Sequence, residues 1–326
     1  MKPYIIYFLL LLMVGCGDSD TYSSPAMSSN PLTDTLVKTS DISYNGQYTL
    51  IADNKQVCLW NNKTLQLQLP CLIGKAKDYI EIVKIAKNND YFVTSNRVSV
   101  RLYSINDGKL VGEWSLQGHI INDIALSKNS DVILLGFRSG KVSVINPFTK
   151  AMATYQKHKL DINSVSISDD GRFAFTGSSD KSAIYWDTIT GKTIHRFEHR
   201  SRVNHVSLSG DHKIGFSLDG ISDKKIWNLQ TGILVSELDS HQRFIMMNDS
   251  KISLNNQLLL TGSPKQTLQL WRITDGKLIA QWQATHLKSR SSVLSVAFEE
   301  STLLSVTSDG ILEVWQYPSQ STINQP

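Results

Sequence analysis

The stretch that decides the fold is residues 161–197, DINSVSISDDGRFAFTGSSDKSAIYWDTITGKTIHRF. Alternating apolar and polar residues at its start, in DINSVSIS, predict a half-buried strand. The turn formers SDDG at residues 168–171 separate this strand from a second one, RFAFTGS. A third strand, SAIYW, ends at Trp186, and the turn TGK leads into a fourth strand, KTIHRF. The expected unit is therefore a small four-stranded antiparallel sheet.

The end of the third strand is a landmark that recurs along the chain. The gaps between successive landmarks are 43, 42, 41, 41, 44 and 44 residues. A period of that size, in segments of strand-like composition, predicts one small sheet, or blade, per repeat around a common axis. We expect seven blades with cores near residues 37–71, 79–114, 120–156, 161–198, 202–238, 244–283 and 292–317. Their landmarks are Trp60, Tyr103, Ile145, Trp186, Trp227, Trp271 and Trp315.

Other residue types recur at fixed distances from the landmark. In several repeats a glycine follows it by five residues and a large apolar residue by eleven, while a hydroxyl residue precedes it by ten and a histidine by about 28. These are Gly108, Gly191, Gly232 and Gly276; Trp114, Phe197, Leu238 and Trp282; Thr176, Ser217, Thr261 and Ser305; and His158, His199, His241 and His286. The repeats resemble WD40 repeats, most clearly in GSSD at residues 177–180 and WD at 186–187. This resemblance, which covers residues 37–317, implies an all-β, seven-bladed propeller of four-stranded antiparallel blades.

Four residues of the fourth blade form a set that includes the hydroxyl, imidazole and carboxylate groups of a nucleophilic catalytic triad. They are His158, Thr176, Asp180 and Trp186. The WD40 resemblance instead implies a buried hydrogen-bond chain from indole to hydroxyl to imidazole to carboxylate, which locks the blade because buried polar groups must be paired. The pattern recurs in several blades, whereas an active site is needed only once. We therefore expect a structural tetrad and no catalytic residues here.

The seventh blade lacks an obvious outer strand after Trp315. Either residues 26–33 or residues 318–325 could supply it, and the habit of the WD40 family favours the amino-terminal segment. Pro31 would disfavour a central strand but is tolerated at a sheet edge.

The amino terminus is typical of an export signal. Lys2 precedes an apolar run at residues 5–14, which is too short for a spanning helix and is followed at once by Cys16. The segment LMVGC resembles the lipobox of bacterial lipoproteins, which implies that the Cys16 thiol receives a diacylglycerol. An ordinary secretory peptide is the alternative. Gly17, where an aspartate would imply retention at the inner membrane, implies delivery to the outer membrane, facing the periplasm.

The expected organisation is a signal peptide at residues 1–15, a lipidated flexible tether at 16–34 and a propeller at 35–326. The tether is rich in Ser, Asp, Asn and Pro and has little to bury. A coil of this length reaches roughly 20 to 25 Å, which would let the propeller tilt freely above a membrane. The net charge of +4 is too small to indicate nucleic-acid binding.

Two cysteines remain besides Cys16, and their pairing stays open. An oxidising envelope would permit a disulfide between Cys58 and Cys71. If the first blade follows the register of the others, residue 58 lies opposite residue 69. Cys71 would then be a diagonal neighbour at roughly 7–8 Å, near or beyond the limit for a bridge.

The connections between blades are basic and give the one functional hypothesis. They emerge on one face of such a propeller, and five of the six carry cationic groups, with few acidic ones among them. We expect the cluster to attract an acidic surface, which in an envelope could be a partner protein, anionic lipid headgroups or peptidoglycan carboxylates. The candidate binding residues are Lys157, Lys159, Arg200, Arg202, Arg243, Lys288 and Arg290, with Lys75 and Lys77 in the first connection. Solvated loop charges without a partner are the alternative.

A second class of function would be an enzyme or glycan-binding propeller with its site at the mouth of the central channel. It would need acidic or metal-ligating side chains converging from several inner strands. Candidates near the starts of these strands are Asp123, Asp161, Asn163, Asn204 and His205. The sequence has no phosphate-binding glycine loop and no metal-binding Cys/His spacing, so we expect neither a cofactor nor a metal site.

Overall fold

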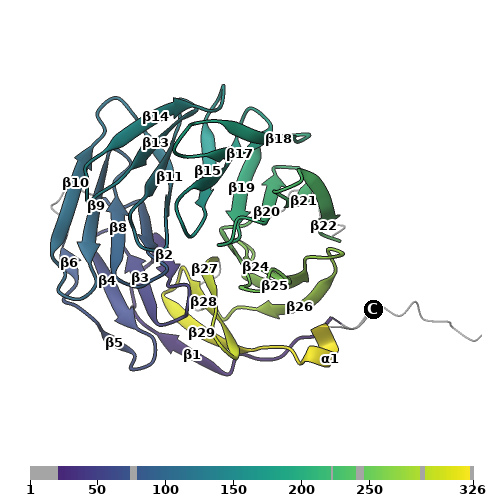
Figure 1. Cartoon of the computed structure of the whole chain (residues 1–326). Helices are drawn as coiled ribbons and strands as arrows, with labels where there is room; N and C mark the ends of the chain where they lie inside the picture. The colour runs from purple at the N-terminus through teal and green to yellow at the C-terminus, as the bar shows by residue number, and fades with distance from the viewer. Residues whose placement is uncertain (1–20, 74–78, 222, 240–245, 287–290, 324–326) are drawn as a thin grey trace, which may run out of the picture.

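The computed structural model of the chain describes residues 21–73, 79–221, 223–239, 246–286 and 291–323. The strands within these residues form seven antiparallel sheets around a central opening (Figure 1). All seven landmark residues lie in the third strand of their blade. The all-β architecture of seven small antiparallel blades that the sequence predicts is confirmed.

The strands follow one another from the centre of the ring outward in each blade, except that the outer strand of blade 7 comes from the amino terminus. Blade 1 contains β2 (Thr39–Ile42), β3 (Tyr48–Ala52), β4 (Gln56–Asn61), β5 (Gln66–Leu67) and β6 (Leu72–Ile73); blade 2 contains β7 (Ile82–Ile85), β8 (Tyr91–Ser95), β9 (Ser99–Ser104) and β10 (Leu110–Ser115). Blade 3 contains β11 (Ile121–Leu126), β12 (Ile133–Phe137), β13 (Lys141–Ile145) and β14 (Met152–Gln156); blade 4 contains β15 (Ile162–Ile167), β16 (Phe173–Ser178), β17 (Ser182–Asp187) and β18 (Thr193–Glu198). Blade 5 contains β19 (Val203–Leu208), β20 (Ile214–Asp219), β21 (Lys224–Asn228) and β22 (Ile233–Glu237); blade 6 contains β23 (Asp249–Ile252), β24 (Leu258–Gly262), β25 (Thr267–Arg272) and β26 (Leu278–Gln283). Blade 7 contains β27 (Val293–Phe298), β28 (Thr302–Thr307), β29 (Ile311–Gln316) and β1 (Ser28–Pro31), and a helix, α1 (Gln320–Ile323), follows.

The core lies between the faces of neighbouring blades. Valine, leucine and isoleucine side chains of one blade pack against those of the next, as in the cluster that joins Leu134 and Val142 of blade 3 to Ile162 and Trp186 of blade 4. The approach is close: a Cβ added at Gly177 would lie 2.6 Å from Val203 Cγ1 of the following blade. Each blade therefore needs its neighbour to bury its apolar face.

The turn between the third and fourth strands has a residue in the left-handed region five positions after the landmark. Gly276 has a φ of +73°, and a Cβ there would meet the backbone oxygen of Glu237. The recurring turn glycines Gly108, Gly191, Gly232 and Gly276 thus lie where the backbone needs a positive φ. Leu65 and Lys150 occupy the same turn position in blades 1 and 3 with positive φ, which their residue types did not indicate.

The amino-terminal segment closes the ring. Strand β1 pairs antiparallel with β29, with Ser28 opposite Val314 and Pro31 at the edge opposite Ile311. The amino-terminal alternative is therefore confirmed. The other alternative is wrong, because the chain after β29 forms α1 rather than a strand.

The expected boundary of a flexible tether at residue 34 is also wrong. Tyr22 makes an isolated parallel bridge with Ala280, and Met27 N donates to Val314 O at 2.8 Å. The physical reason is that the outer edges of blades 6 and 7 offer unpaired backbone groups. Residues 1–20, including the expected signal and Cys16, lie outside the described residues. In the described part of the chain, no helix has the length and apolar character needed to cross a membrane.

Blade 1 contains a disulfide between Cys58 and Cys71, with the Cα atoms 4.4 Å apart. The expected diagonal geometry is wrong because the outer strand is split into two pieces. Trp60 lies opposite Leu67 in β5, but Val57 lies opposite Leu72 in β6, which is a shift of two residues in register. The shift brings residue 71 opposite residue 58.

Candidate functional site

The propeller has two faces with different connections. The links between blades and the turns between second and third strands lie together, since Ser179 N donates to Asp161 O and Gly220 N donates to Arg202 O, both at 2.9 Å. We call this end of the ring the connection face. The opposite face contains the turns between first and second strands, such as residues 168–171, and those between third and fourth strands.

Exposed cations gather on the connection face. Lys159 and Arg202 lie in links between blades, and Arg138 and Lys181 lie in turns between second and third strands; all four side chains are exposed. Among the described residues, no carboxylate lies within ion-pair distance of Lys159, Lys181 or Arg202. Arg200 is also exposed, with its Nε 3.6 Å from Asp223 Oδ1. Other candidates, Arg243, Lys288 and Arg290, lie outside the described residues, as do Lys75 and Lys77.

Lys157 does not belong with these exposed cations. Its Nζ donates to Gly191 O at 2.9 Å and to Thr193 Oγ1 at 2.8 Å, and it lies 5.0 Å from the ring centroid of Trp186. Burial lowers its pKa. The structure therefore gives Lys157 a packing role at the junction of blades 3 and 4, where its ammonium lies over the landmark tryptophan.

Apolar side chains are exposed beside the cations. Tyr79, Ile120 and Leu160 lie in links between blades and are 55%, 40% and 52% exposed. Further exposed apolar residues on this face are Leu36, Val98, Ile221 and Met246. The opposite face also exposes apolar residues, Leu254 among them, so exposure alone does not distinguish the faces. Exposed lysines outside an ion pair also occur on both faces of the described structure. The arginines differ: Arg172 and Arg272 of the opposite face are paired with carboxylates, whereas Arg138 and Arg202 of the connection face have no carboxylate partner among the described residues.

The expected tetrad of blade 4 is formed except for one link. His158 Nε2 lies 2.9 Å from Thr176 Oγ1, and its Nδ1 lies 3.1 Å from both carboxylate oxygens of Asp180. The indole nitrogen of Trp186, however, has no hydrogen-bond partner among the described residues. The pKa of Asp180 is lowered well below its usual range: burial opposes this, but the hydrogen bonds from His158 and Ser182 outweigh it.

The indole link missing from blade 4 is present in the next three blades. Trp227 Nε1 donates to Ser217 Oγ at 2.8 Å, and His199 Nε2 lies 2.9 Å from the same hydroxyl. In blades 6 and 7 the indoles donate to hydroxyls at 3.1 and 2.9 Å. The acceptors are Thr261 for Trp271 and Ser305 for Trp315.

Glu313 takes the place of a histidine in blade 7. His286 is exposed, whereas Glu313 is fully buried and accepts from Ser305 Oγ at 3.3 Å and from Thr285 N at 2.8 Å. Burial raises the pKa of its carboxyl. The repeat pattern did not single out this residue, although an acidic residue in the apolar strand LEVW was an available signal.

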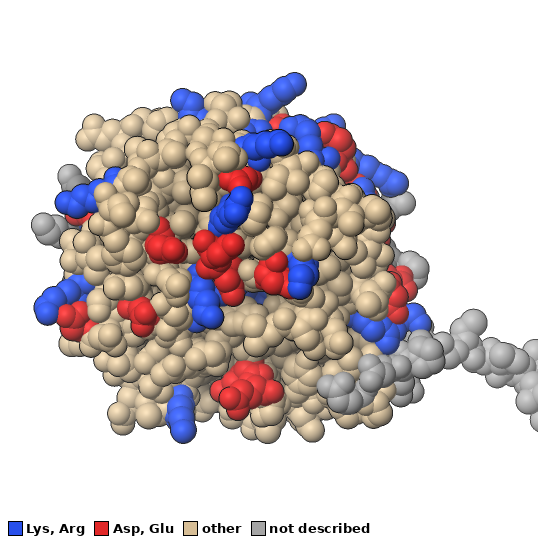
Figure 2. Space-filling model, viewed as in Figure 1, with Lys and Arg blue, Asp and Glu red and all other residues tan. Residues whose placement is uncertain are grey.

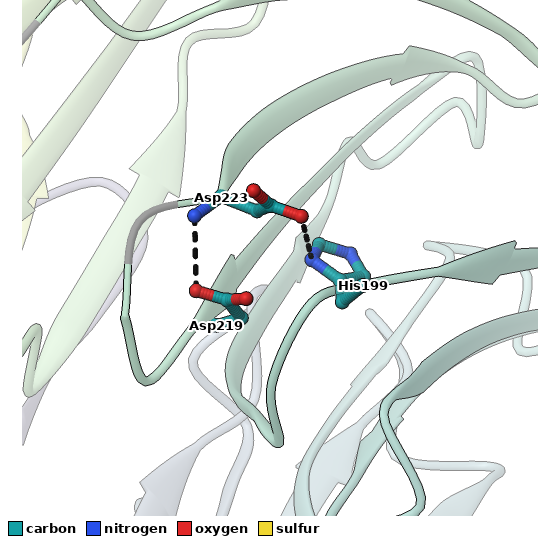
Figure 3. Close-up of side chains that lie close together, drawn as sticks. All are labelled: His199, Asp219 and Asp223. Atoms are coloured by element: carbon teal, nitrogen blue, oxygen red, sulfur yellow. Dashed lines mark hydrogen bonds and ion pairs between the residues drawn. The ribbon is translucent and has the colours of Figure 1, made fainter.

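One cluster has the side-chain types of a metal site. His199, Asp219 and Asp223 place one ligand-type atom each within 4.8 Å of one another (Figure 3). Asp219 accepts hydrogen bonds from the backbone of Ser201 and Asp223, both at 2.9 Å. Lys225 Nζ already lies 2.9 Å from Asp223 Oδ2. Because backbone donors and an ammonium occupy the carboxylates, we interpret the cluster as the blade 5 version of the tetrad.

The channel residues form a second candidate site. A cavity of about 700 Å³ is lined by the inner strands of blades 1 to 6 and includes Asp123, Asn163, Asn204 and His205 but not Asp161. Acidic and basic side chains gather around the centre of the ring in Figure 2. Four of the five channel candidates therefore line this cavity.

Several channel side chains are engaged in joining neighbouring blades. Asp123 Oδ2 accepts from Val165 N at 2.8 Å, and Asn163 Nδ2 donates to Val203 O at 2.8 Å. His205 Nε2 lies 2.8 Å from Ser250 Oγ. Burial raises the pKa of Asp123 and lowers that of His205 to about 4. These contacts cross from one inner strand to the next, so they hold the ring together.

A lysine links two other carboxylates across the channel. Lys251 Nζ lies 3.2 Å from Asp249 Oδ1 and 3.5 Å from Asp41 Oδ1. Burial alone would lower the pKa of Lys251, but the two carboxylates outweigh it and raise the pKa. Asp41 belongs to blade 1 and Asp249 to blade 6, so this bridge spans blade 7.

Comparison with known proteins agrees with this geometry. Residues 149–187 match the family model described as WD domain, G-beta repeat. A chain in the crystal structure of the mitotic checkpoint complex is similar over 98% of this chain and 99% of that chain, with a TM-score of 0.76 and 16% identical residues. At that identity the likeness concerns the fold. The protein is a seven-bladed β-propeller of the WD40 type.

Proposed function

We propose that the protein is a non-catalytic scaffold that binds an acidic partner protein through its connection face. The observation that supports this most is the set of exposed cations at Lys159, Lys181 and Arg202, which have no ion-pair partner in the described structure and lie on the same face as exposed Leu160 and Tyr79. Arginine and large apolar or aromatic side chains are enriched in protein interfaces. WD40 propellers commonly act as protein-binding scaffolds, and the similar chain in the mitotic checkpoint complex is part of a protein assembly.

The channel supports the non-catalytic part of the proposal. Asp123 and His205, which would be the acid–base candidates, make hydrogen bonds to neighbouring blades. A general base must be able to reach a proton on a substrate. Side chains whose polar atoms hold the ring together are poorly placed for that task.

We further propose that the protein is anchored by lipid at Cys16, in the periplasmic leaflet of the outer membrane. The support is the sequence of residues 1–17, with its apolar run and the segment LMVGC. Each buried methylene of an acyl chain contributes about 0.8 kcal/mol, so two or three chains hold a protein durably. The disulfide Cys58–Cys71 is consistent with an oxidising compartment.

Reversing the charges of exposed cations tests whether the partner binds through the connection face. The triple variant Arg138→Glu, Lys159→Glu and Arg202→Glu should weaken partner binding strongly without lowering the melting temperature, because exposed charges contribute little to folding. The matched control reverses three exposed lysines of the opposite face, Lys63, Lys128 and Lys192. Both variants change the net charge by the same amount. Binding is measured by co-purification from detergent-solubilised envelopes, followed by titration with the purified partner.

The proposal also predicts a salt dependence. Binding should weaken as the salt concentration rises from about 50 to 500 mM, since the Debye length shortens to a few ångströms. Equal loss of binding in the two triple variants would show that net charge matters rather than this face. Binding that survives the first variant and high salt would place the interface elsewhere.

Cys16→Ser tests the anchor separately. The variant should leave the membrane fraction, or keep its signal peptide. A protein that still sediments with outer membranes and matures normally would contradict the lipid anchor without affecting the docking proposal.

A further inference from the structure

The residues that follow the expected lipid site are bound to the outer edge of blade 6. Tyr22 N donates to Ile279 O at 3.3 Å, and Gln281 N donates to Tyr22 O at 2.9 Å. The Tyr22 ring meets Trp282 edge-on, with centroids 6.2 Å apart, and Trp282 Nε1 donates to Ser24 Oγ at 3.3 Å. This segment therefore acts as an extra edge on β26.

The direction of the pairing between Tyr22 and β26 shows at which end of blade 6 the described chain begins. Tyr22 bridges Ala280 in parallel, so the chain here runs in the same direction as β26, and Thr21 lies toward the start of that strand. That end of the strand follows the turn at residues 274–277, which belongs to the face opposite the connection face. The described chain thus begins beside the rim of blade 6, at the end of the blade that is remote from the exposed cations.

The distance to the lipid site is short. Residues 17–20 alone separate Cys16 from Thr21. Five residue steps of extended chain span at most about 17 to 18 Å. A long tether running up to residue 34 would have allowed the propeller to turn freely. The docking of Tyr22 and the pairing of β1 with β29 remove most of that length.

We infer that the bilayer surface faces the rim of blade 6 at its β25–β26 turn, so that the ring stands on this edge and the membrane leaves the connection face uncovered. This inference rests on the proposed lipid anchor at Cys16. It assigns an orientation: the blade 6 turn lies near the lipid headgroups, blade 3 lies on the far side of the ring (Figure 1), and the docking surface is open to the periplasm.

Fluorescence energy transfer from a donor dye on the propeller to labelled lipid tests the orientation. Single cysteines are introduced by Thr274→Cys in the β25–β26 turn and, as a matched control, by Thr149→Cys in the corresponding turn of blade 3; both threonines are exposed. Cys58 and Cys71 are paired, so one reactive thiol remains when Cys16 is acylated. The lipidated full chain is reconstituted into phosphatidylethanolamine–phosphatidylglycerol vesicles that carry a headgroup acceptor dye. We expect transfer from residue 274 to be several-fold more efficient than from residue 149.

An insertion variant removes the limit that the short chain between Cys16 and Thr21 places on the orientation of the propeller. Inserting twelve Gly/Ser residues between Asp20 and Thr21 lengthens the connection, and the difference between the two labels should then shrink markedly. Equal transfer from both positions in the uninserted protein would overturn the orientation while leaving the anchor intact. If the protein fails to bind vesicles and Cys16→Ser behaves identically, the anchor itself is wrong and the orientation falls with it.

Discussion

At the scale of single residues, the landmark tryptophan is hydrogen-bonded in some blades and only packed in another. Trp271 donates its indole hydrogen to Thr261, whereas Trp186 is equally buried and donates to none of the residues that the structure describes. The sequence predicts a hydrogen bond from each indole to the threonine ten residues before it, because this spacing is the same in both blades. What differs is the packing around Trp186, where Lys157 lies over the ring. Such a contact between blades leaves no periodic signal in the sequence.

Substitutions at these two tryptophans should separate packing from hydrogen bonding. Trp271→Phe should cost about 1 kcal/mol more than Trp186→Phe, because only the first leaves a buried hydroxyl without its donor. Trp186→Ala should cost about 3–5 kcal/mol, from the cavity alone, since Thr176 keeps its contact with His158. Urea unfolding measures all three free energies. An equal cost for the two phenylalanine variants would show that the indole of Trp186 is hydrogen-bonded in solution.

Two buried histidines should make stability depend on pH. Burial lowers the pKa of His199 and of His205 to about 4, from a usual 6.5. Below pH 6.5 the unfolded chain takes up protons that the folded chain does not, so the free energy of unfolding falls as pH drops from 6.5 to 4, and their contribution is complete above 6.5. Calorimetry should show a shallower decline in the double variant His199→Gln, His205→Gln. Parallel curves for the two proteins would contradict this assignment.

At the scale of elements, the blades could be predicted from the sequence but their irregular edges could not. Strand alternation and the landmark locate β15 to β18 to within a residue or two, because burial of one blade face against the next imposes the pattern. The split outer strand of blade 1 escaped prediction. Its register depends on a shift between β5 and β6, and the paired cysteines there were the only hint. Edge strands are weakly specified, because only one side of them is paired.

The disulfide should stabilise blade 1 measurably. It closes a loop with a sequence separation of 13 residues, for which chain-entropy arguments give about 3 kcal/mol. The variant Cys58→Ala, Cys71→Ala should lose roughly that amount in urea unfolding. The unmodified protein under reducing conditions should behave like the variant. Stability that is unchanged by reduction would mean that the thiols are not paired in the native protein.

At the scale of the whole molecule, the ring is closed by a segment far away in sequence. Strand β1 completes blade 7, and Leu32 and Val37 are buried in the cluster between blades 7 and 1. Deleting residues 21–31 should therefore lower the melting temperature by many degrees and expose β29 as an edge. Deletion of residues 320–326, which removes no strand, is the comparison. Equal effects of the two deletions would argue against closure by β1.

The function could be predicted less fully than the fold. The basic connections were visible in the sequence, but that Lys157 packs inward while Lys159 stays exposed depends on tertiary contacts. The channel candidates likewise had suitable residue types, and only the structure shows that Asp123 and Asn163 bridge neighbouring blades. Loop charge suggests a partner without naming it.

Site-specific photo-crosslinking tests docking through the connection face most directly. A photoreactive amino acid is placed at Leu160 on the connection face and, in a second protein, at Leu254 on the opposite face; these side chains are 52% and 84% exposed. After irradiation of intact cells, we expect a discrete protein adduct from position 160 that disappears when Arg138, Lys159 and Arg202 are reversed. Position 254 should give no such adduct. An adduct from 254 alone, or one from 160 that persists after charge reversal, would contradict docking through the connection face.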